Sequence, residues 1–305
     1  MENRGRGFTH VFLDFGMRYY RLEGAAGPRL VARRGGEARD LTAAKPGLAT
    51  LSDLARAADL ADATLDGIAE RHFADAPAVD SDPLDAEAGL PVDAAEVWAA
   101  GVTYAISEEA REDESSVPET YLDVYDADRP EIFFKATPSR TVGPGEAVGI
   151  RTDSGWDAPE PELGVVLHRG RIVGFTIGND VSSRDIEGEN PLYLPQGKVY
   201  DRCCSLGPCV ASTASVPDPH DLRMDLEIVR DGETAFADTT STGGMVRTCE
   251  ELVSYLTRSN PLPEIAVLLT GTALVPPEAF TLRPGDEVAI EIESIGRLHN
   301  PVVEV

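Results

Sequence analysis

The chain has 305 residues, 42% of them hydrophobic, which suits one large domain or two domains with ample material for a core. Its 53 acidic side chains outnumber 27 basic ones, and the formal net charge of −26 argues against binding of nucleic acid or of an anionic membrane through bulk charge. Such an acidic surface is typical of proteins from a salt-saturated cytoplasm, where screening weakens the self-repulsion, so we expect a halophilic protein.

Residues 1–85 are expected to form a small N-terminal α+β domain. Apolar segments at Thr9–Asp14, Met17–Leu22 and Arg29–Ala32 predict a β-meander, and an apolar period near 3.6 predicts a helix over residues 48–72. The segment begins MENRGRGF, without the apolar core of a signal sequence, and no later stretch approaches the length of a membrane span. We therefore expect a cytoplasmic protein.

A stretch rich in Ala, Asp and Pro at residues 74–96 predicts a linker, and we place the domain boundary near residue 85. Residues 86–305 then form a β-rich second domain, because short apolar runs alternate there with Gly and Pro. Residues 108–128 are polar and acidic, and two interpretations stay open: a mobile lid over a site, or a solvated surface helix. The next predicted strand, IFFKA, carries one lysine expected to be buried, Lys135.

The stretch that begins at Pro159 gives the strongest chemical signal. Glu160 and Glu162 lie two residues apart, which puts both carboxylates on one face of a strand. A turn at His168–Gly170 and a second apolar strand form a hairpin that brings Asp180 back beside them. Three carboxylates at one point repel each other strongly unless a cation lies among them, and oxygen-only ligation suits Mg2+, Mn2+ or Ca2+. The sequence therefore predicts a divalent-metal site made by these three acids.

A solvated strand face is the alternative interpretation of the two glutamates, and it is the more usual role of such a pair in an acidic protein. The prolines before Glu160 and Glu162 and the apolar run after them favour the edge of a core instead. Further along, three clustered cysteines lack C-x-x-C spacing and a nearby histidine, so we interpret them as small buried hydrophobic residues rather than a zinc site: Cys203, Cys204 and Cys209.

The C-terminal third is predicted to be strands around one helix. The apolar pattern predicts, in order, a hairpin of Met224–Val229 and Glu233–Thr239, a helix over Thr248–Ser259, a strand broken at Gly271-Thr272, and a last strand that alternates Val288, Ile290 and Ile292. The many short strands and few helices indicate an α+β, β-rich fold for this domain.

With these residues in view, the chain resembles the fumarylacetoacetate hydrolase superfamily over roughly residues 95–305. The motifs that carry the resemblance occur in the family's order: E-x-E at Glu160–Glu162, GNDVSSRD at Gly178–Asp185, QGK at Gln196–Lys198, SLGP at Ser205–Pro208 and GTA at Gly271–Ala273. The resemblance implies a mixed β-sandwich roll that binds Mg2+, or Mn2+, through Glu160, Glu162 and Asp180. It also implies a homo-oligomer, a dimer or a tetramer.

Three segments are similar to a narrower group in that superfamily, the 2-keto-3-deoxypentonate dehydratases: RPEIFFKATPSR, PEPELGVVL and ENPLYLPQGKVY. This likeness implies dehydration of a 2-keto-3-deoxypentonate, derived from arabinonate or xylonate, to 2-oxoglutarate semialdehyde in oxidative pentose degradation. By matching positions, Lys198 is a candidate base or substrate-holding cation, and Glu131 is a candidate acid. Arg184, Thr272 and Gln196 are the candidates for binding the small 2-keto acid.

One departure from the wider superfamily bears on the reaction. Many of its hydrolases and decarboxylases carry a G-x-N-Y-x-x-H-x-x-E loop, and Ser107 stands here where that histidine is expected. A serine alone cannot act as a base near neutral pH, which favours a lyase. A C–C hydrolase of acylpyruvate or fumarylacetoacetate type, or a decarboxylase, remains the alternative, with Glu109 or Glu112 as its base. A metal-stabilised binding protein is a third possibility.

Overall fold

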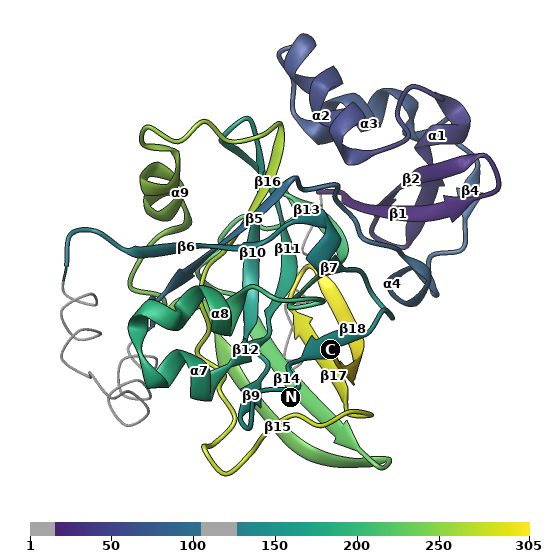
Figure 1. Cartoon of the computed structure of the whole chain (residues 1–305). Coiled ribbons are helices and arrows are strands. Elements are labelled where there is room, and N and C mark those ends of the chain that lie inside the picture. Colours follow the sequence, from purple (N-terminus) through teal and green to yellow (C-terminus); the bar gives the residue numbers. More distant parts are fainter. Residues whose placement is uncertain (1–15, 105–126) are drawn as a thin grey trace, which may run out of the picture.

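A computed structural model gives the structure of the chain and describes residues 16–104 and 127–305. The largest element in this part of the chain is an eleven-stranded sheet with the order β4-β3-β2-β1-β13-β11-β10-β16-β5-β6, in which β7 pairs with β13 (Figure 1). Its strands are β1 (Arg18–Gly24), β2 (Gly27–Arg34), β3 (Glu37–Asp40), β4 (Ala78–Val79), β5 (Glu96–Gly101), β6 (Glu131–Ala136), β7 (Thr141–Val142), β10 (Pro161–His168), β11 (Arg171–Asp180), β13 (Cys204–Ser212) and β16 (Ile265–Leu269).

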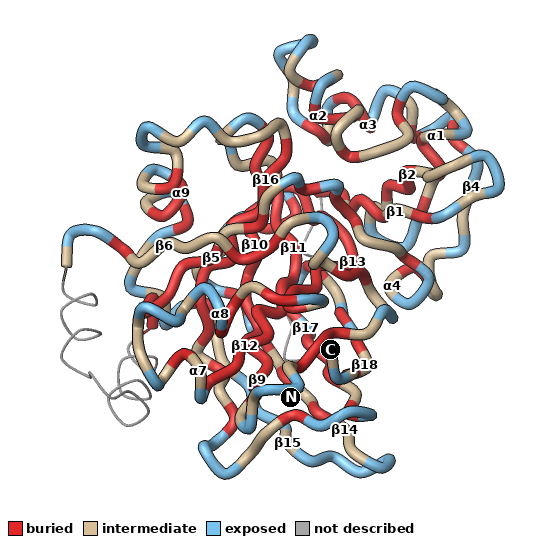
Figure 2. Tube along the Cα trace, in the orientation of Figure 1, coloured by how far each residue is buried: buried red, intermediate tan, exposed pale blue. Residues whose placement is uncertain are grey.

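The β10–β11 hairpin lies near the middle of this sheet. Every residue of β10 is buried, which is why its sequence is continuously apolar after the glutamates instead of alternating (Figure 2). The two strands are joined by Arg169 and Gly170, both with positive φ, as a two-residue turn between right-twisted strands requires. The predicted hairpin is confirmed.

A second sheet covers one face of the first. Its order is β15-β14-β17-β18-β8, from β8 (Val148–Ile150), β14 (Arg223–Arg230), β15 (Glu233–Ser241), β17 (Glu287–Ile292) and β18 (Gly296–Glu304). Alternate residues such as Leu226 and Ile290 point into one hydrophobic cluster with Leu163 and Ile177 of the large sheet. Two short strands, β9 (Asp157–Ala158) and β12 (Ser182–Ser183), form a separate pair beside the hairpin. The predicted hairpin at Met224–Thr239 is confirmed as β14 and β15.

Short helices flank the sheets. They are α1 (Leu41–Ala44), α2 (Leu51–Leu60), α3 (Leu65–Phe73), α4 (Leu84–Glu87), α7 (Arg184–Glu189), α8 (Leu194–Lys198) and α9 (Cys249–Thr257), with 3-10 turns η1 (Pro138–Arg140), η2 (Pro191–Tyr193) and η3 (Thr242–Gly244). The helix predicted near Thr248–Ser259 is confirmed as α9. No helix in the described ranges is long and apolar enough to cross a bilayer.

The single helix predicted over residues 48–72 is wrong. The structure has two helices there, because Thr64 caps a new helix by accepting a hydrogen bond from the Gly67 amide, just after Asp62 takes a positive φ. The helices α7 and α8 were not predicted. The expected strand at Thr9–Asp14 and most of the predicted lid at residues 108–128 lie outside the described residues.

The N-terminal strands continue the large sheet rather than forming one of their own. Strand β1 pairs with β13, so β1–β4 extend the sheet that contains the β10–β11 hairpin, while α1–α3 pack beside this extension (Figure 1). The expected boundary near residue 85 falls in α4, where the Asp85 carboxylate accepts from the Tyr20 hydroxyl and the Arg297 amide. We retain the division into residues 1–85 and 86–305 as a proposal.

Candidate active site

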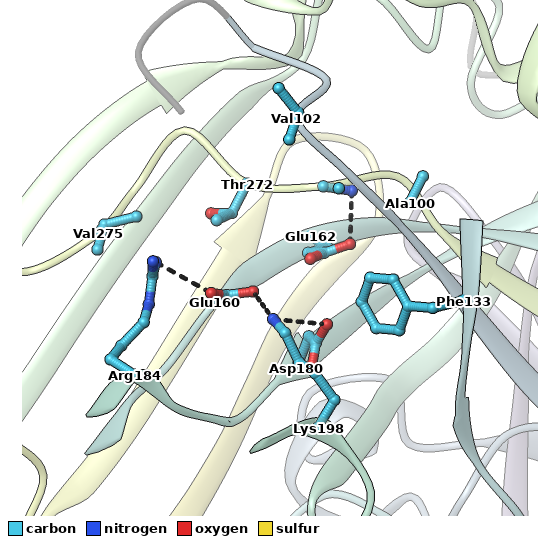
Figure 3. A pocket seen from close by; sticks show the side chains of 12 residues that line it. Ala100, Val102, Phe133, Glu160, Glu162, Asp180, Arg184, Lys198, Thr272 and Val275 are labelled. Carbon is cyan, nitrogen blue, oxygen red and sulfur yellow. Dashed lines mark hydrogen bonds and ion pairs between the residues drawn. The ribbon is translucent and has the colours of Figure 1, made fainter. Parts of the chain in front are cut away.

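Three buried carboxylates meet at the open end of the β10–β11 hairpin (Figure 3). Glu160 directly precedes β10, Glu162 lies within it, and Asp180 ends β11; the Asp180 amide donates to the Glu160 carbonyl over 2.9 Å. One ligand oxygen from each side chain lies within 4.8 Å of the other two. Their exposed fractions are 3%, 1% and 0%, so water cannot solvate them.

Glu160, Glu162 and Asp180 are called the acid trio below. Their negative charges would repel one another if no cation lay among them. Burial raises the pKa of Glu162 well above its ordinary value, and the charges of Asp180 and Glu160 raise it further, against the opposing effect of Lys198. A divalent cation would relieve this repulsion. The all-oxygen donor set fits Mg2+ or Mn2+, so the residues present suit the metal that the resemblance implies.

Lys198 lies against the acid trio. Its ammonium group is 2.6 Å from Glu160 Oε2 and 3.3 Å from Asp180 Oδ2 (Figure 3). It also donates to the Ser182 hydroxyl over 2.7 Å. Only 1% of its surface is exposed. The end of α8 therefore places a lysine at the one point where two of the acids converge.

Arg184 and Thr272 also face this point. The guanidinium of Arg184 lies 3.0 Å from Glu160 Oε1, while the neighbouring Asp185 accepts instead from Ser154 and the Gly155 amide. Arg184 and Thr272 line a cavity with the acid trio; its full lining is Ala100, Gly101, Val102, Phe133, Glu160, Glu162, Asp180, Arg184, Lys198, Gly271, Thr272 and Val275 (Figure 3).

The strand break predicted at Gly271-Thr272 forms one wall of the cavity. The Gly271 amide donates to Glu162 Oε2 over 2.6 Å, and Gly271 has a φ of +88°. A Cβ at this position would lie 2.0 Å from the Thr103 hydroxyl, so both the backbone angle and the space require glycine. The Thr272 hydroxyl accepts from the Leu274 amide, which fixes the turn.

Glu131 borders the cavity through Gly101. It begins β6 and pairs in register with Gly101 of β5. A Cβ on Gly101 would lie 1.9 Å from Glu131 Oε2, so the carboxylate occupies the space that the glycine leaves. Gly101 lines the cavity but Glu131 does not, so the structure places the Glu131 carboxylate behind the wall that Gly101 forms.

Gln196 lies elsewhere. It is exposed on α8 and is not among the residues that line the cavity. It belongs to a surface hollow on the other side of Phe133, and its carbonyl accepts from Arg151. The reason is helical geometry: residues two apart differ by about 200° around the axis, so Lys198 points inward and Gln196 outward.

Two further residues lie next to Lys198 and were not predicted from the sequence. The Ser182 hydroxyl accepts a hydrogen bond from the Lys198 ammonium group. Glu187 is 3% exposed, and its Oε2 atom lies 3.8 Å from that ammonium group. The signal was present in the spacing of Arg184 and Glu187, because residues three apart share a helix face. Because α7 was not predicted, that spacing could not be interpreted.

The predicted loop at Ser107 lies outside the described residues. The cysteines are free and buried, as predicted.

Comparison with known proteins agrees with this geometry. The family model described as fumarylacetoacetate (FAA) hydrolase C-terminal matches residues 96–303. A Haloferax volcanii protein named "Probable 2-keto-3-deoxyxylonate dehydratase" is 60% identical over 289 residues, 95% of this chain and 100% of that protein. A Saccharolobus solfataricus protein named 2-dehydro-3-deoxy-D-arabinonate dehydratase is 48% identical over 217 residues, 70% of this chain and 73% of that protein.

A solved structure extends the likeness to three dimensions. The structure described as 2-keto-3-deoxy-D-arabinonate dehydratase complexed with magnesium and 2,5-dioxopentanoate has a TM-score of 0.80 and 36% identity, and the match covers 95% of this chain and 99% of that one. The strand-rich α+β fold expected from the sequence is confirmed by this match.

Proposed function

The chain belongs to the fumarylacetoacetate hydrolase superfamily, and from that premise we propose that it is a metal-dependent hydro-lyase acting on a 2-keto-3-deoxypentonate. The product is 2-oxoglutarate semialdehyde, which is 2,5-dioxopentanoate. The observation that carries the proposal is the buried acid trio beside Lys198 and Arg184, in a chain whose 60% identical relative is matched over its whole length.

The acid trio would hold Mg2+, or Mn2+ in its place. When bound, the cation supplies a Lewis acid that draws electron density from the 2-oxo group and makes the C3 protons more acidic. Arg184 lies at the same cavity and can bind the substrate carboxylate with its guanidinium, which fixes the direction in which the chain of the sugar acid enters.

Lys198 is the proposed base for the C3 proton. Its burial and the nearby Lys135 favour a neutral amine, and Glu160 and Asp180, which stabilise the ammonium form, would do so less if they held a metal ion. The alternative, in which Lys198 stays charged and holds the substrate oxygens, makes a different prediction. Only the base role requires the lysine for exchange of C3 hydrogen with solvent.

Glu131 is the proposed acid for the leaving hydroxyl. The C3–H bond breaks, the C4–O bond breaks, and the hydroxyl departs as water with a proton from Glu131, leaving a double bond between C3 and C4. A proton lost from C5 and one gained at C3 then move this double bond to C4–C5, and the resulting enol becomes the aldehyde. One water is lost in all, so the product differs from the substrate by H2O alone.

Purified protein with Mg2+ and each C4 epimer of the 2-keto-3-deoxypentonate tests the proposal directly. We expect a C5 aldehyde product without loss of carbon, from at least one epimer, and no product after chelation of the metal. Two acid products would instead indicate a C–C hydrolase, and no product a binding protein. The comparisons do not favour the hydrolase. We further propose a cytoplasmic homo-oligomer, which the family resemblance supports.

A further inference from the structure

Lys135 is a buried cation to which the reaction described above assigns no direct step. It lies on β6, at the irregularity where the register with β5 shifts between Phe134 and Ala136. Lys135 is 0% exposed and is not among the residues that line the cavity.

Three oxygen atoms lie around the ammonium group of Lys135, one in an ion pair and two in hydrogen bonds. Nζ lies 2.5 Å from Asp180 Oδ1, and it donates to the carbonyls of Val181 over 2.9 Å and Lys198 over 2.6 Å. The Tyr200 hydroxyl donates to the same Val181 carbonyl. Lys135 therefore ties together the end of β11 and the end of α8, the two backbone segments that carry Asp180 and Lys198.

The two carboxylate oxygens of Asp180 therefore have different partners. Oδ1 is held by Lys135 from behind, and Oδ2 faces the ammonium group of Lys198 at the cavity. We propose that Lys135 is a positioning residue that reserves Oδ1 and so restricts Asp180 to single-oxygen ligation of the metal. This inference rests on the proposed metal site at Glu160, Glu162 and Asp180.

Restriction to one oxygen has a consequence for metal choice. Mg2+ demands a near-octahedral shell at short distances, whereas Ca2+ accepts two oxygens from one carboxylate and a larger coordination number. A carboxylate locked in one orientation favours the smaller ion. If Lys135 is removed, Asp180 can rotate and offer both oxygens, which favours Ca2+.

The ratio of the two metal affinities isolates this effect. Loss of a nearby positive charge strengthens binding of any divalent cation, but it changes Mg2+ and Ca2+ alike and cancels in the ratio. A lysine that merely stabilised the fold would change the melting temperature and leave the ratio intact. The affinity ratio thus distinguishes positioning of Asp180 from a general charge effect and from stabilisation of the fold.

The test is calorimetric titration of MgCl2 and CaCl2 into the metal-free wild type and the Lys135→Met variant, without substrate. We expect Lys135→Met to shift the Mg2+ to Ca2+ affinity ratio toward Ca2+ by about tenfold or more. Arg230→Met is the matched control, because Arg230 also pairs with a buried acid, Asp286, but outside the cavity. Its ratio should match the wild type.

Three results would overturn the inference or its premise. A folded Lys135→Met variant with an unchanged ratio rejects the role of Lys135 and leaves the proposed function standing. Wild type that binds neither ion rejects the metal site and the proposed function with it. If Lys135→Met does not fold, a crystal structure of the wild type with Mn2+ decides: Oδ1 on Lys135 with only Oδ2 on the ion supports the inference, and ligation by both oxygens overturns it.

Discussion

Glu162 has a demanding environment for a charged group. It is 1% exposed, it has two acids beside it, and it accepts a hydrogen bond from the Gly271 amide. Burial first, and then the charges of Asp180 and Glu160, raise the pKa of Glu162 well above its ordinary value, which disfavours its charged form. A neutral side chain of the same shape should therefore be tolerated by the fold but not by the metal.

Glu162→Gln tests this directly. We expect the variant to fold with a melting temperature close to the wild type, because the amide keeps an acceptor for Gly271. Mg2+ affinity should fall by about a hundredfold, and dehydratase activity with it, because one of three anionic ligands is lost. Calorimetry and an aldehyde assay measure the two effects. Turnover that persists in metal-free buffer would reject the site.

Lys198→Met separates the two roles left open for this lysine. If Lys198 takes the C3 proton, incorporation of solvent deuterium at C3 should be at least about a hundredfold slower in the variant, which should still bind Mg2+. Proton NMR of the substrate in D2O follows the exchange. Continued exchange at the wild-type rate, with dehydration abolished, would assign Lys198 the holding role instead.

Asp157 gives a pH effect away from the acid trio. Burial, chiefly, raises its pKa from 3.8 to about 6, so the folded state holds the proton more tightly than the unfolded state. A raised carboxyl pKa contributes stability below pH 4 that is lost as pH rises through 6. The side chain of Asp157→Asn stays neutral, so the variant does not lose this stability. Between pH 5 and pH 8, its unfolding free energy should rise by about 1 kcal/mol relative to that of the wild type. Urea unfolding at the two pH values checks this, and a constant difference contradicts it.

Secondary-structure elements show where sequence reasoning succeeds and where it stops. The period of two at Glu160 and Glu162, and a turn of the right length, were enough to predict that Asp180 comes back beside them. The pairing of β1 with β13 joins segments almost 200 residues apart, and no local pattern reports such a contact. The stretch before Lys198 is polar and has no apolar period, so α7 and α8 could not be predicted. Without α8, the outward direction of Gln196 could not be predicted either.

Gly101 is the position at which strand geometry and chemistry meet. Gly101→Ala should push the Glu131 carboxylate off its place, because the added Cβ would overlap Oε2. We expect activity to fall by about a hundredfold, with Mg2+ affinity unchanged, since the acid trio is not touched. Gly47→Ala is the matched control, as nothing lies within 4 Å of its Cβ. Equal activity of both variants would remove Glu131 from the site.

At the scale of the whole molecule, the net charge of −26 opposes compaction. Exposed ion pairs act in the other direction: Arg56 binds Glu264, and Arg169 binds Asp59 on α2, which ties the N-terminal helices to the β10–β11 turn. Each exposed pair contributes little to stability, and salt weakens it. The repulsion is the larger effect, because it sums over the whole surface.

Added salt should therefore stabilise this protein. The Debye length falls from about 10 Å at 0.1 M to about 3 Å at 1 M, so most of the repulsion should vanish in that interval. We expect the melting temperature to rise by several degrees from 0.1 to 1 M KCl, measured by calorimetry on the metal-free protein. Arg56→Gln removes the two exposed pairs of Arg56, with Asp53 and Glu264, and should lower the melting temperature at 0.1 M by a degree or two but not at 1 M, where those pairs are already screened. A melting temperature that falls over the same interval would mean that the ion pairs outweigh the repulsion, and that the acidic surface is not an adaptation to salt.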